Sequence, residues 1–180
     1  RLYMQWHSPG WYQEGDAEFD LLADIVATGK TSRLYRTLVY EKQIAQDIFA
    51  SQSSREMSGT FGITATAAPG HDLAELEAAI DAELKVLLAK GVTDREVSLS
   101  RTRFQANAVR ELQQIGGFGG KADRLNRYNV LVGDPGYLKA DLARYDAANA
   151  ASVNAWMRRF IDLDRRGVLW IVPQGKLAAA

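Results

Sequence analysis

Residues 27–35 read ATGKTSRLY, and the Gly29-Lys30-Thr31 at their centre matches the end of a phosphate-binding P-loop. The full pattern is G-x-x-x-x-G-K-[ST], in which the first glycine lets backbone N–H groups curl around the phosphates. Here Asp24 occupies the position of that glycine, and its carboxylate would repel phosphate. The match is incomplete, so we rank a nucleotide-binding module at Lys30 third, after the two hypotheses given below.

The segment before Gly29 has the spacing of a helix, whereas a P-loop requires a strand there. Apolar residues recur at i, i+3, i+4 and i+7, at Phe19, Leu22, Ala23 and Val26. We expect Asp16 to cap this helix at its start and Gly29 to close it with a positive φ. Thr31 or Ser32 then serves as the N-cap of the next helix.

The composition limits the class of protein. The 22 basic and 22 acidic side chains cancel, which removes the broad positive field typical of proteins that bind nucleic acid or anionic membranes. No apolar run reaches the roughly 18 residues of a membrane-spanning helix. The chain has no cysteine, and therefore no thiolate metal ligand and no cysteine nucleophile. We expect no nucleic acid, no membrane and no cofactor bound by this chain.

The chain opens in a strand and not at an initiator methionine. Apolar Leu2, Met4 and Trp6 alternate with Tyr3, Gln5 and His7, the period of a half-buried strand. At 180 residues the sequence has the length of one domain, and such a domain buries about 70% of its unfolded surface. We interpret residues 1–180 as a single domain that belongs to a longer polypeptide.

The remaining pattern predicts an α+β fold, in which a mainly antiparallel sheet of four or more strands packs against a layer of helices. Further strands are expected at 47–53, 60–67 and 168–172, the first two joined by a hairpin turn. Helices are expected at 16–27, 32–41, 72–90, from 93 to the glycines at 116–120, at 121–132, and within 137–160 with a restart at 151–152.

Two helix starts carry capping signals. Asp72 with Glu75 resembles a capping box, and Thr93 with Glu96 forms a second one. The first helix has an apolar face made of Leu73, Leu76, Ile80, Leu84 and Leu87. The second is expected to place Val97, Phe104, Ala108, Leu112 and Ile115 on one side.

Residue types that carry chemistry are sparse. His7 and His71 are 64 positions apart and in no zinc-binding spacing, so each is expected to have a surface or capping role. No G-x-S-x-G nucleophile elbow occurs. The carboxylate pairs fall in the first turns of expected helices, where they favour the helix dipole, at Asp16/Glu18, Glu75/Glu77 and Asp94/Glu96.

The glycines of GGFGG at 116–120 permit two interpretations. With Lys121 they could hold an anion at a helix N-terminus, but a helix and not a strand precedes them. We favour a backbone hinge between two helices. Asn126, Tyr128 and Asn129 are candidates to hold that hinge through side-chain hydrogen bonds.

The run GKTSRLYRTLVYEKQIAQDIFAS at 29–51 resembles the later domains of pitrilysin/insulinase-type (M16) zinc metallopeptidases. A small-residue turn joins two helices there, and Ser32, Arg33, Leu34 and Tyr35 match that motif letter for letter. The order of elements follows the family over nearly the whole chain. The resemblance implies the LuxS/MPP-like metallohydrolase fold.

The resemblance also implies where the catalytic residues of such peptidases are held. They have four homologous domains, and zinc binds to an H-x-x-E-H motif and a distant Glu in the first one; this chain has no such motif. An Arg and a Tyr of the fourth domain reach the substrate, and their positions hold Val39 and Gln46 here. Valine cannot donate to an oxyanion and glutamine lacks the phenol, so we expect no catalytic residue. Arg36 and Tyr40 are displaced and do not replace the pair.

The first hypothesis is a catalytically silent domain of a zinc metalloendopeptidase that shapes a peptide chamber, with zinc on another domain. Its partners would be other M16 domains, in the same chain or in a partner subunit, and a peptide substrate. The alternative is a non-proteolytic scaffold subunit of the same fold. An H-x-x-E-H motif in the parent chain would decide between them. The resemblance favours a periplasmic or secreted location, without excluding the cytoplasm.

Overall fold

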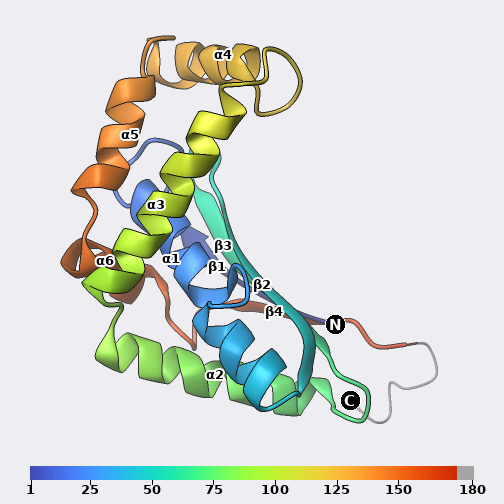
Figure 1. Cartoon of the computed structure of the whole chain (residues 1–180). Coiled ribbons are helices and arrows are strands. Elements are labelled where there is room, and N and C mark those ends of the chain that lie inside the picture. Colours follow the sequence, from blue (N-terminus) through green and yellow to red (C-terminus); the bar gives the residue numbers. More distant parts are fainter. Residues whose placement is uncertain (174–180) are drawn as a thin grey trace.

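The computed structural model describes residues 1–173 and has the predicted α+β architecture (Figure 1). The strands are β1 (Leu2–Ser8), β2 (Ala45–Ser53), β3 (Gly59–Ala67) and β4 (Gly167–Trp170). The helices are α1 (Asp16–Ala27), the π-helix η1 (Tyr35–Glu41), α2 (Leu73–Lys90), α3 (Asp94–Glu111), α4 (Lys121–Val132), α5 (Leu138–Ala147) and α6 (Ala150–Phe160). The four strands form one antiparallel sheet in the order β2-β3-β1-β4. No described helix is long and apolar enough to cross a membrane.

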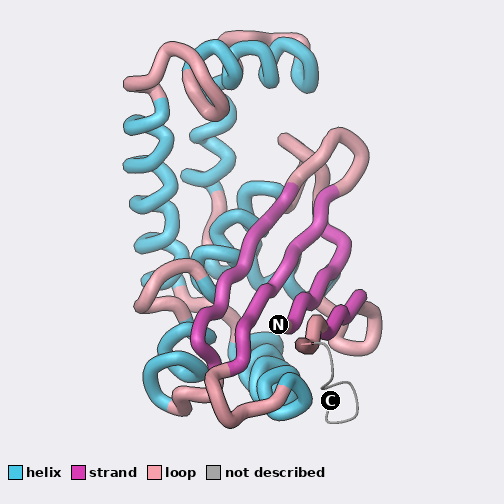
Figure 2. Tube along the Cα trace, turned by 90° about the vertical axis from the view of Figure 1, so that its right-hand side faces the viewer, coloured by secondary structure: helices cyan, strands magenta, loops and turns pink. Residues whose placement is uncertain are grey.

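The sheet has one buried and one open face, and the predicted register of β1 is confirmed. Leu2 and Met4 are 0% exposed and Trp6 is 2% exposed, while Gln5 and His7 are exposed. Figure 2 shows the strands in front and most of the helices behind them, so within residues 1–173 one face of the sheet stays uncovered. The buried apolar side chains of β1 therefore pack against the helices, and the exposed Gln5 and His7 face outwards.

Helices α1, α2 and α6 cover the sheet with apolar side chains. All five α2 residues predicted for its apolar face are buried. In α1, Phe19 meets Phe61 of β3 and Phe160 of α6 edge-to-face, with ring centroids 5.6 and 5.7 Å apart. Trp156 of α6 lies against Gly15, where an added Cβ would be 2.5 Å from the indole. Gly15 also has φ 88°, so this position admits only glycine.

The helix-capping predictions are confirmed in part. Thr93 and Glu96 form a complete capping box. Asp72 accepts a hydrogen bond from the Glu75 backbone N–H, but the Glu75 carboxylate instead contacts His71 Nδ1 at 2.7 Å. The predicted capping role of Asp16 was wrong, because Gly15 is the N-cap and makes no side-chain hydrogen bond.

The turn at 28–32 connects two helices, as predicted. Gly29 follows α1 with φ 81° and an open space around it. The Ser32 hydroxyl donates to the Gly29 carbonyl at 2.7 Å and does not accept from the helix that follows. That helix continues as η1, whose hydrogen bonds span five residues, as in Lys42 N–H to Thr37 O at 2.9 Å.

Arg33 of the SRLY motif joins this turn to the start of α3. Its guanidinium binds both carboxylate oxygens of Glu96 at 2.7 Å and the Gly91 carbonyl at 2.9 Å. Burial acts to raise the pKa of Glu96, but the hydrogen bonds from Arg33 and Thr93 outweigh it and lower that pKa to about 2. The motif that carries the family resemblance therefore has a structural role.

Helices α3, α4 and α5 form an arm that extends beyond the sheet (Figure 1). α3 ends at Glu111, so the expectation that Ile115 lies on its apolar side was wrong, and Ile115 is 78% exposed. The helix restart predicted at 151–152 occurs one residue earlier, with Asn149 as the N-cap. The last strand ends at Trp170 and not at Val172.

The two faces of β1 give a direct test of the register. Met4→Ala should lower the free energy of unfolding by about 2–5 kcal/mol, because it leaves a cavity in the core. Gln5→Ala, one residue away on the open face, should change it by less than about 0.5 kcal/mol. Urea unfolding followed by circular dichroism measures both. Equal losses for the two variants would contradict the assignment of faces.

Candidate functional site

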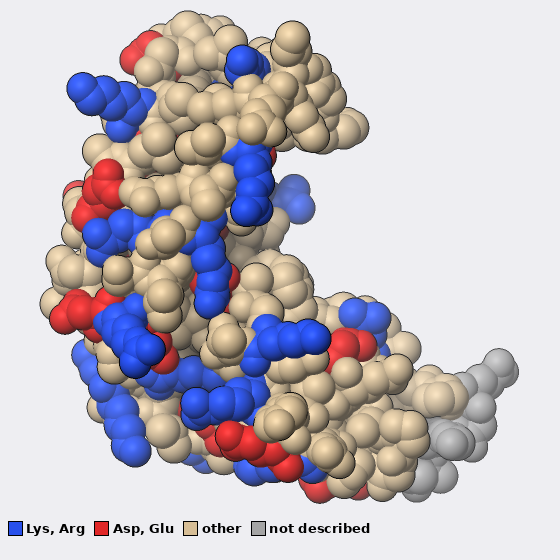
Figure 3. All heavy atoms as spheres, in the orientation of Figure 1, with Lys and Arg blue, Asp and Glu red and all other residues tan. Residues whose placement is uncertain are grey.

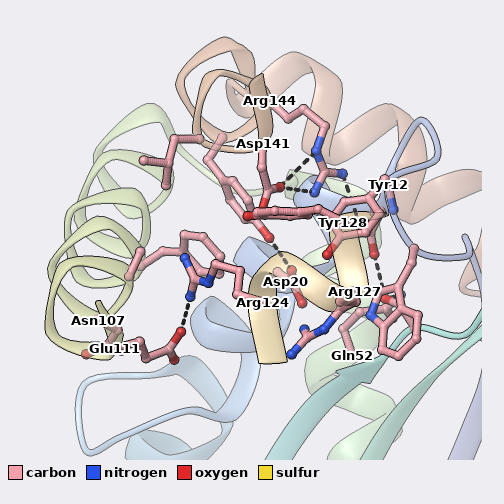
Figure 4. Close-up of a pocket in the computed structure, with 17 residues that line it drawn as sticks. Tyr12, Asp20, Gln52, Asn107, Glu111, Arg124, Arg127, Tyr128, Asp141 and Arg144 are labelled. Carbon is pink, nitrogen blue, oxygen red and sulfur yellow. Dashed lines mark hydrogen bonds and ion pairs between the residues drawn. The ribbon is translucent and has the colours of Figure 1, made fainter. Parts of the chain in front are cut away.

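The arm and the rest of the domain, which we call the body, enclose a pocket of about 300 Å³ (Figure 4). Its walls come from the loop before α1, from α1, from the end of β2 and from all three helices of the arm. Charged and aromatic side chains line it, among them Asp16, Asp20, Arg124, Tyr128, Asp141 and Arg144. Sequence reasoning did not bring these residues together.

Arg144 of α5 is the centre of the charged cluster. Its Nη1 lies 3.0 Å from Asp16 Oδ2 of α1, and its Nη2 binds Asp141 one turn earlier. Asp16 is 2% exposed and accepts two more hydrogen bonds, from the Tyr12 N–H at 2.9 Å and from the Ser54 hydroxyl at 2.5 Å. One guanidinium thus binds two carboxylates, and the hydrogen bonds from Tyr12 and Ser54 help to stabilise the buried Asp16.

Tyr12, Tyr128 and Tyr137 pack together between the arm and the body. The buried Tyr128 hydroxyl donates to Asp141 at 2.6 Å. Its ring centroid lies 5.5 Å from Tyr12 and 5.6 Å from Tyr137. Burial, with the Asp141 hydrogen bond and charge, raises the pKa of Tyr128 above its usual value. The phenol therefore stays protonated and keeps donating.

A second contact joins α5 to α1 deeper in the pocket. The Tyr145 hydroxyl donates to Asp20 Oδ2 at 2.6 Å, and its ring stacks on Phe104 at 3.6 Å. Burial raises the pKa of Asp20 to about 7, although the Tyr145 hydrogen bond acts in the opposite direction. A shifted carboxyl in a cleft is a common mark of catalysis. Here its nearest partner is a phenol whose own pKa is raised by burial, so the pair offers no activated nucleophile.

Val39 and Gln46, to which the resemblance assigns the family's Arg and Tyr positions, lie outside this pocket. Val39 is in η1 and packs partly against the core. Gln46 is exposed at a β-bulge in β2, between the paired residues Ala45 and Asp47. Arg36 forms an ion pair with Glu41 at 3.4 Å and so is engaged locally.

The partial P-loop forms one wall of a shallow groove against α3. Asp24, at the position of the missing glycine, pairs with Arg103 at 2.9 Å. Arg103 also donates to the Thr31 hydroxyl at 3.0 Å. As predicted, helix α1 leads into Gly29 in place of the strand that a P-loop requires.

No three His, Asp or Glu side chains within residues 1–173 are grouped so that they could hold a metal ion. The described residues therefore do not fit zinc. The carboxylates assigned to helix dipoles have specific partners: Asp16 binds Arg144, Glu77 binds Arg166 and Trp170, and the Asp94 carboxylate accepts from the Ala150 N–H. The dipole interpretation was incomplete, because these partners lie far away in the sequence.

The glycine-rich loop is held by hydrogen bonds to its own backbone. Lys121 N–H donates to Gln114 O at 2.9 Å and Ala122 N–H to Ile115 O at 3.1 Å. Asp123 accepts from Gly119 N–H at 3.1 Å. The prediction that Tyr128 holds this segment was wrong, since Tyr128 binds Asp141. Asn126 and Asn129 are exposed.

The structure is an α+β domain in which the charged side chains of the arm pocket mostly bind one another. The family profile described as Peptidase M16 inactive domain matches residues 1–104, more than half of the chain. The chain belongs to this family, as the SRLY block had indicated. A search of curated proteins gave no match.

Solved structures agree on the fold. A protease from Helicobacter pylori superposes with a TM-score of 0.83 at 16% identity, over 96% of this chain and 41% of that one. The inactive peptidase domain of a candidate zinc protease from Bordetella parapertussis gives 0.79 at 19%, over 96% and 92%. A candidate zinc protease from Bordetella pertussis gives 0.77 at 20%, over 96% and 93%. This chain thus spans less than half of the Helicobacter protein and nearly all of the other two chains.

Asp20 should make the stability of the protein depend on pH. Between about pH 4 and 7 the folded state keeps a proton on Asp20 that the unfolded chain, with pKa 3.8, has released, so stability falls as pH rises through this window. Asp20→Asn removes this ionisation and still accepts from Tyr145. It should flatten the decline and add roughly 1–2 kcal/mol at pH 8.

Chemical unfolding at several pH values measures this effect. Glu56→Gln, in the exposed β2–β3 turn, is the matched control and should leave the wild-type slope unchanged. An Asp20→Asn protein whose stability declines as steeply as the wild type would contradict the assignment.

Proposed function

We propose that this chain is a catalytically silent domain of a zinc-dependent metalloendopeptidase, and that it forms part of the wall of the substrate chamber. Zinc and its H-x-x-E-H ligands would belong to another M16 domain, in the same chain or in a partner subunit. The parent protein would then be longer than this chain, and its location periplasmic or secreted, as the family resemblance suggests.

The open face of the sheet carries this proposal. One row of side chains crosses all four strands in register, from Phe49 through Thr64 and Tyr3 to Leu169. Phe49 and Leu169 are 52% and 57% exposed, although large apolar side chains usually lie inside a protein. The next row contains Gly62, where added side-chain atoms would meet only ordinary contacts. The fold does not need that glycine, which leaves room for a close approach from outside.

Such a face suits an unfolded peptide better than one defined ligand. Hydroxyl groups on Thr60, Thr64 and Thr66 of β3 can donate or accept hydrogen bonds. Phe49 and Leu169 can contact apolar side chains of a peptide at the two edges of the sheet. This mixture favours contact with many sequences.

The chamber role can be tested in the full-length parent. Thr64→Arg places a long charged side chain at the centre of the open face and should lower kcat/KM for a fluorogenic peptide several-fold. Lys85→Ala, on the exposed side of α2, is the control and should leave it unchanged. Unaltered cleavage by the Thr64→Arg parent would contradict the proposal. A parent without H-x-x-E-H and without peptidase activity would support the scaffold alternative instead.

The silent character can be tested on the chain itself. The double variant Val39→Arg/Gln46→Tyr should stay as inert toward unfolded peptides as the wild type, because zinc ligands and an activated nucleophile are also lacking among the described residues. Single-turnover cleavage of a fluorogenic peptide is the measurement, with folding checked by circular dichroism. Chelator-sensitive cleavage by the purified chain would refute the silent-domain hypothesis.

A further inference from the structure

Large apolar side chains are exposed at the free end of the arm. Phe118, at the centre of the glycine-rich loop, is fully exposed, and Ile115 is 78% exposed. Gly117 and Gly119 on either side both have φ 81°, a conformation that favours glycine. Because backbone hydrogen bonds order this loop, Phe118 is held outward at little entropic cost to a binding partner.

Helix α4 continues this surface along its outer side. Tyr128 faces the body, whereas Ala122, Leu125, Asn129 and Val132 are exposed at spacings of three and four residues. This spacing places the four residues in one stripe, which we call the α4 stripe. Small and large side chains alternate along it. Such a stripe suits packing against another helix.

The charges around the stripe are mostly engaged within the arm. Arg124 pairs with Glu111, and Arg127 pairs with Asp123. Figure 3 shows the α4 end of the molecule as mostly uncharged in this view. Lys121 begins α4 and Asp134 follows its end, and neither has an ion pair among the described residues.

These two charges lie at the helix ends that disfavour them. A helix N-terminus carries partial positive charge and a C-terminus partial negative charge, so the dipole of α4 repels both Lys121 and Asp134. Within one chain, the dipole thus gives no reason for their placement, although one oxygen of the Asp134 carboxylate accepts from the Gly136 N–H at 2.7 Å. A second α4 lying antiparallel would reverse both interactions.

We propose that two copies of this chain associate through their α4 stripes, packed antiparallel about a two-fold axis. In this register Ala122 faces the partner's Val132 and Leu125 faces the partner's Asn129, so each large side chain meets a smaller one. Lys121 of each copy lies beside the partner's Asp134, which gives two ion pairs. Phe118 reaches the turn that follows α4 in the partner. A two-fold contact of this kind uses the same surface on both copies.

The size of the surface agrees with a reversible dimer. A buried aromatic side chain contributes about 150–250 Å², and the stripe with Ile115 extends the contact over three turns of helix. A standard interface buries about 800 Å² per partner, so a contact limited to these side chains is smaller and fits a weak, reversible association. The association is independent of the chamber role, since the open sheet face lies on other elements.

Sedimentation equilibrium of the purified chain tests the proposal. We expect a dimer with Kd on the order of micromolar, weakened at least tenfold by Phe118→Asp and by Leu125→Asp. Both side chains are exposed, so circular dichroism should show unchanged folding. Val86→Asp, which changes an exposed apolar residue of α2 by the same charge, is the control and should leave Kd unchanged.

A charge exchange tests the antiparallel register. Lys121→Asp and Asp134→Lys should each weaken self-association at least tenfold, because each variant brings like charges together twice. An equimolar mixture of the two variants should recover the wild-type affinity, since every contact again joins opposite charges. A chain that stays monomeric at all concentrations, a dimer indifferent to Leu125→Asp, or a mixture without recovery would each overturn the proposal. So would a stripe that binds only a different M16 domain.

Discussion

The one-sided burial of the sheet is the constraint on which the rest of the structure depends. Side chains alternate between the faces of a strand, so burying Leu2, Met4 and Trp6 leaves the other side of β1 in the open. The helices then gather where the apolar side chains are, and the arm extends from that layer. An uncovered sheet face that carries both polar and apolar side chains is the direct result, and the proposed chamber wall uses this face.

Charged residues serve to join elements that the apolar core does not hold together. Arg33 fixes the turn after α1 to the start of α3, and Arg144 fixes α5 to α1 through Asp16. Both guanidiniums bind carboxylates through more than one hydrogen bond, the geometry in which such pairs are strongest. A carboxylate occupied in this way is not free to act as a base or to hold a metal. The ion pairs of Arg144 therefore explain why the carboxylates of Asp16 and Asp141 in the arm pocket have a structural role.

Local signals predicted the local structure well. The alternation in β1, the capping box of Thr93 and Glu96, and Gly29 as the end of α1 all depend on residues a few positions apart, and all are confirmed. Asp16 was misassigned because its partner Arg144 is 128 positions away, and no spacing rule connects them. The arm pocket escaped prediction for the same reason. Whether Val39 and Gln46 mark a lost catalytic position stays a prediction, since it depends on an alignment with the family.

In the arm, only the three-dimensional structure shows which apolar residues are exposed. The sequence assigned Ile115 to the apolar side of the helix before the glycines, and it made no assignment for Leu125 or Val132. The structure turns the other side of α4 inward through Tyr128 and leaves these residues outside. Burying them would release apolar surface from water, at about 25 cal/mol for each Å². Since the open sheet face and the α4 stripe lie on different elements, contact through one leaves the other free. The proposed peptide contact on the sheet and the proposed contact of the arm are therefore compatible within one domain.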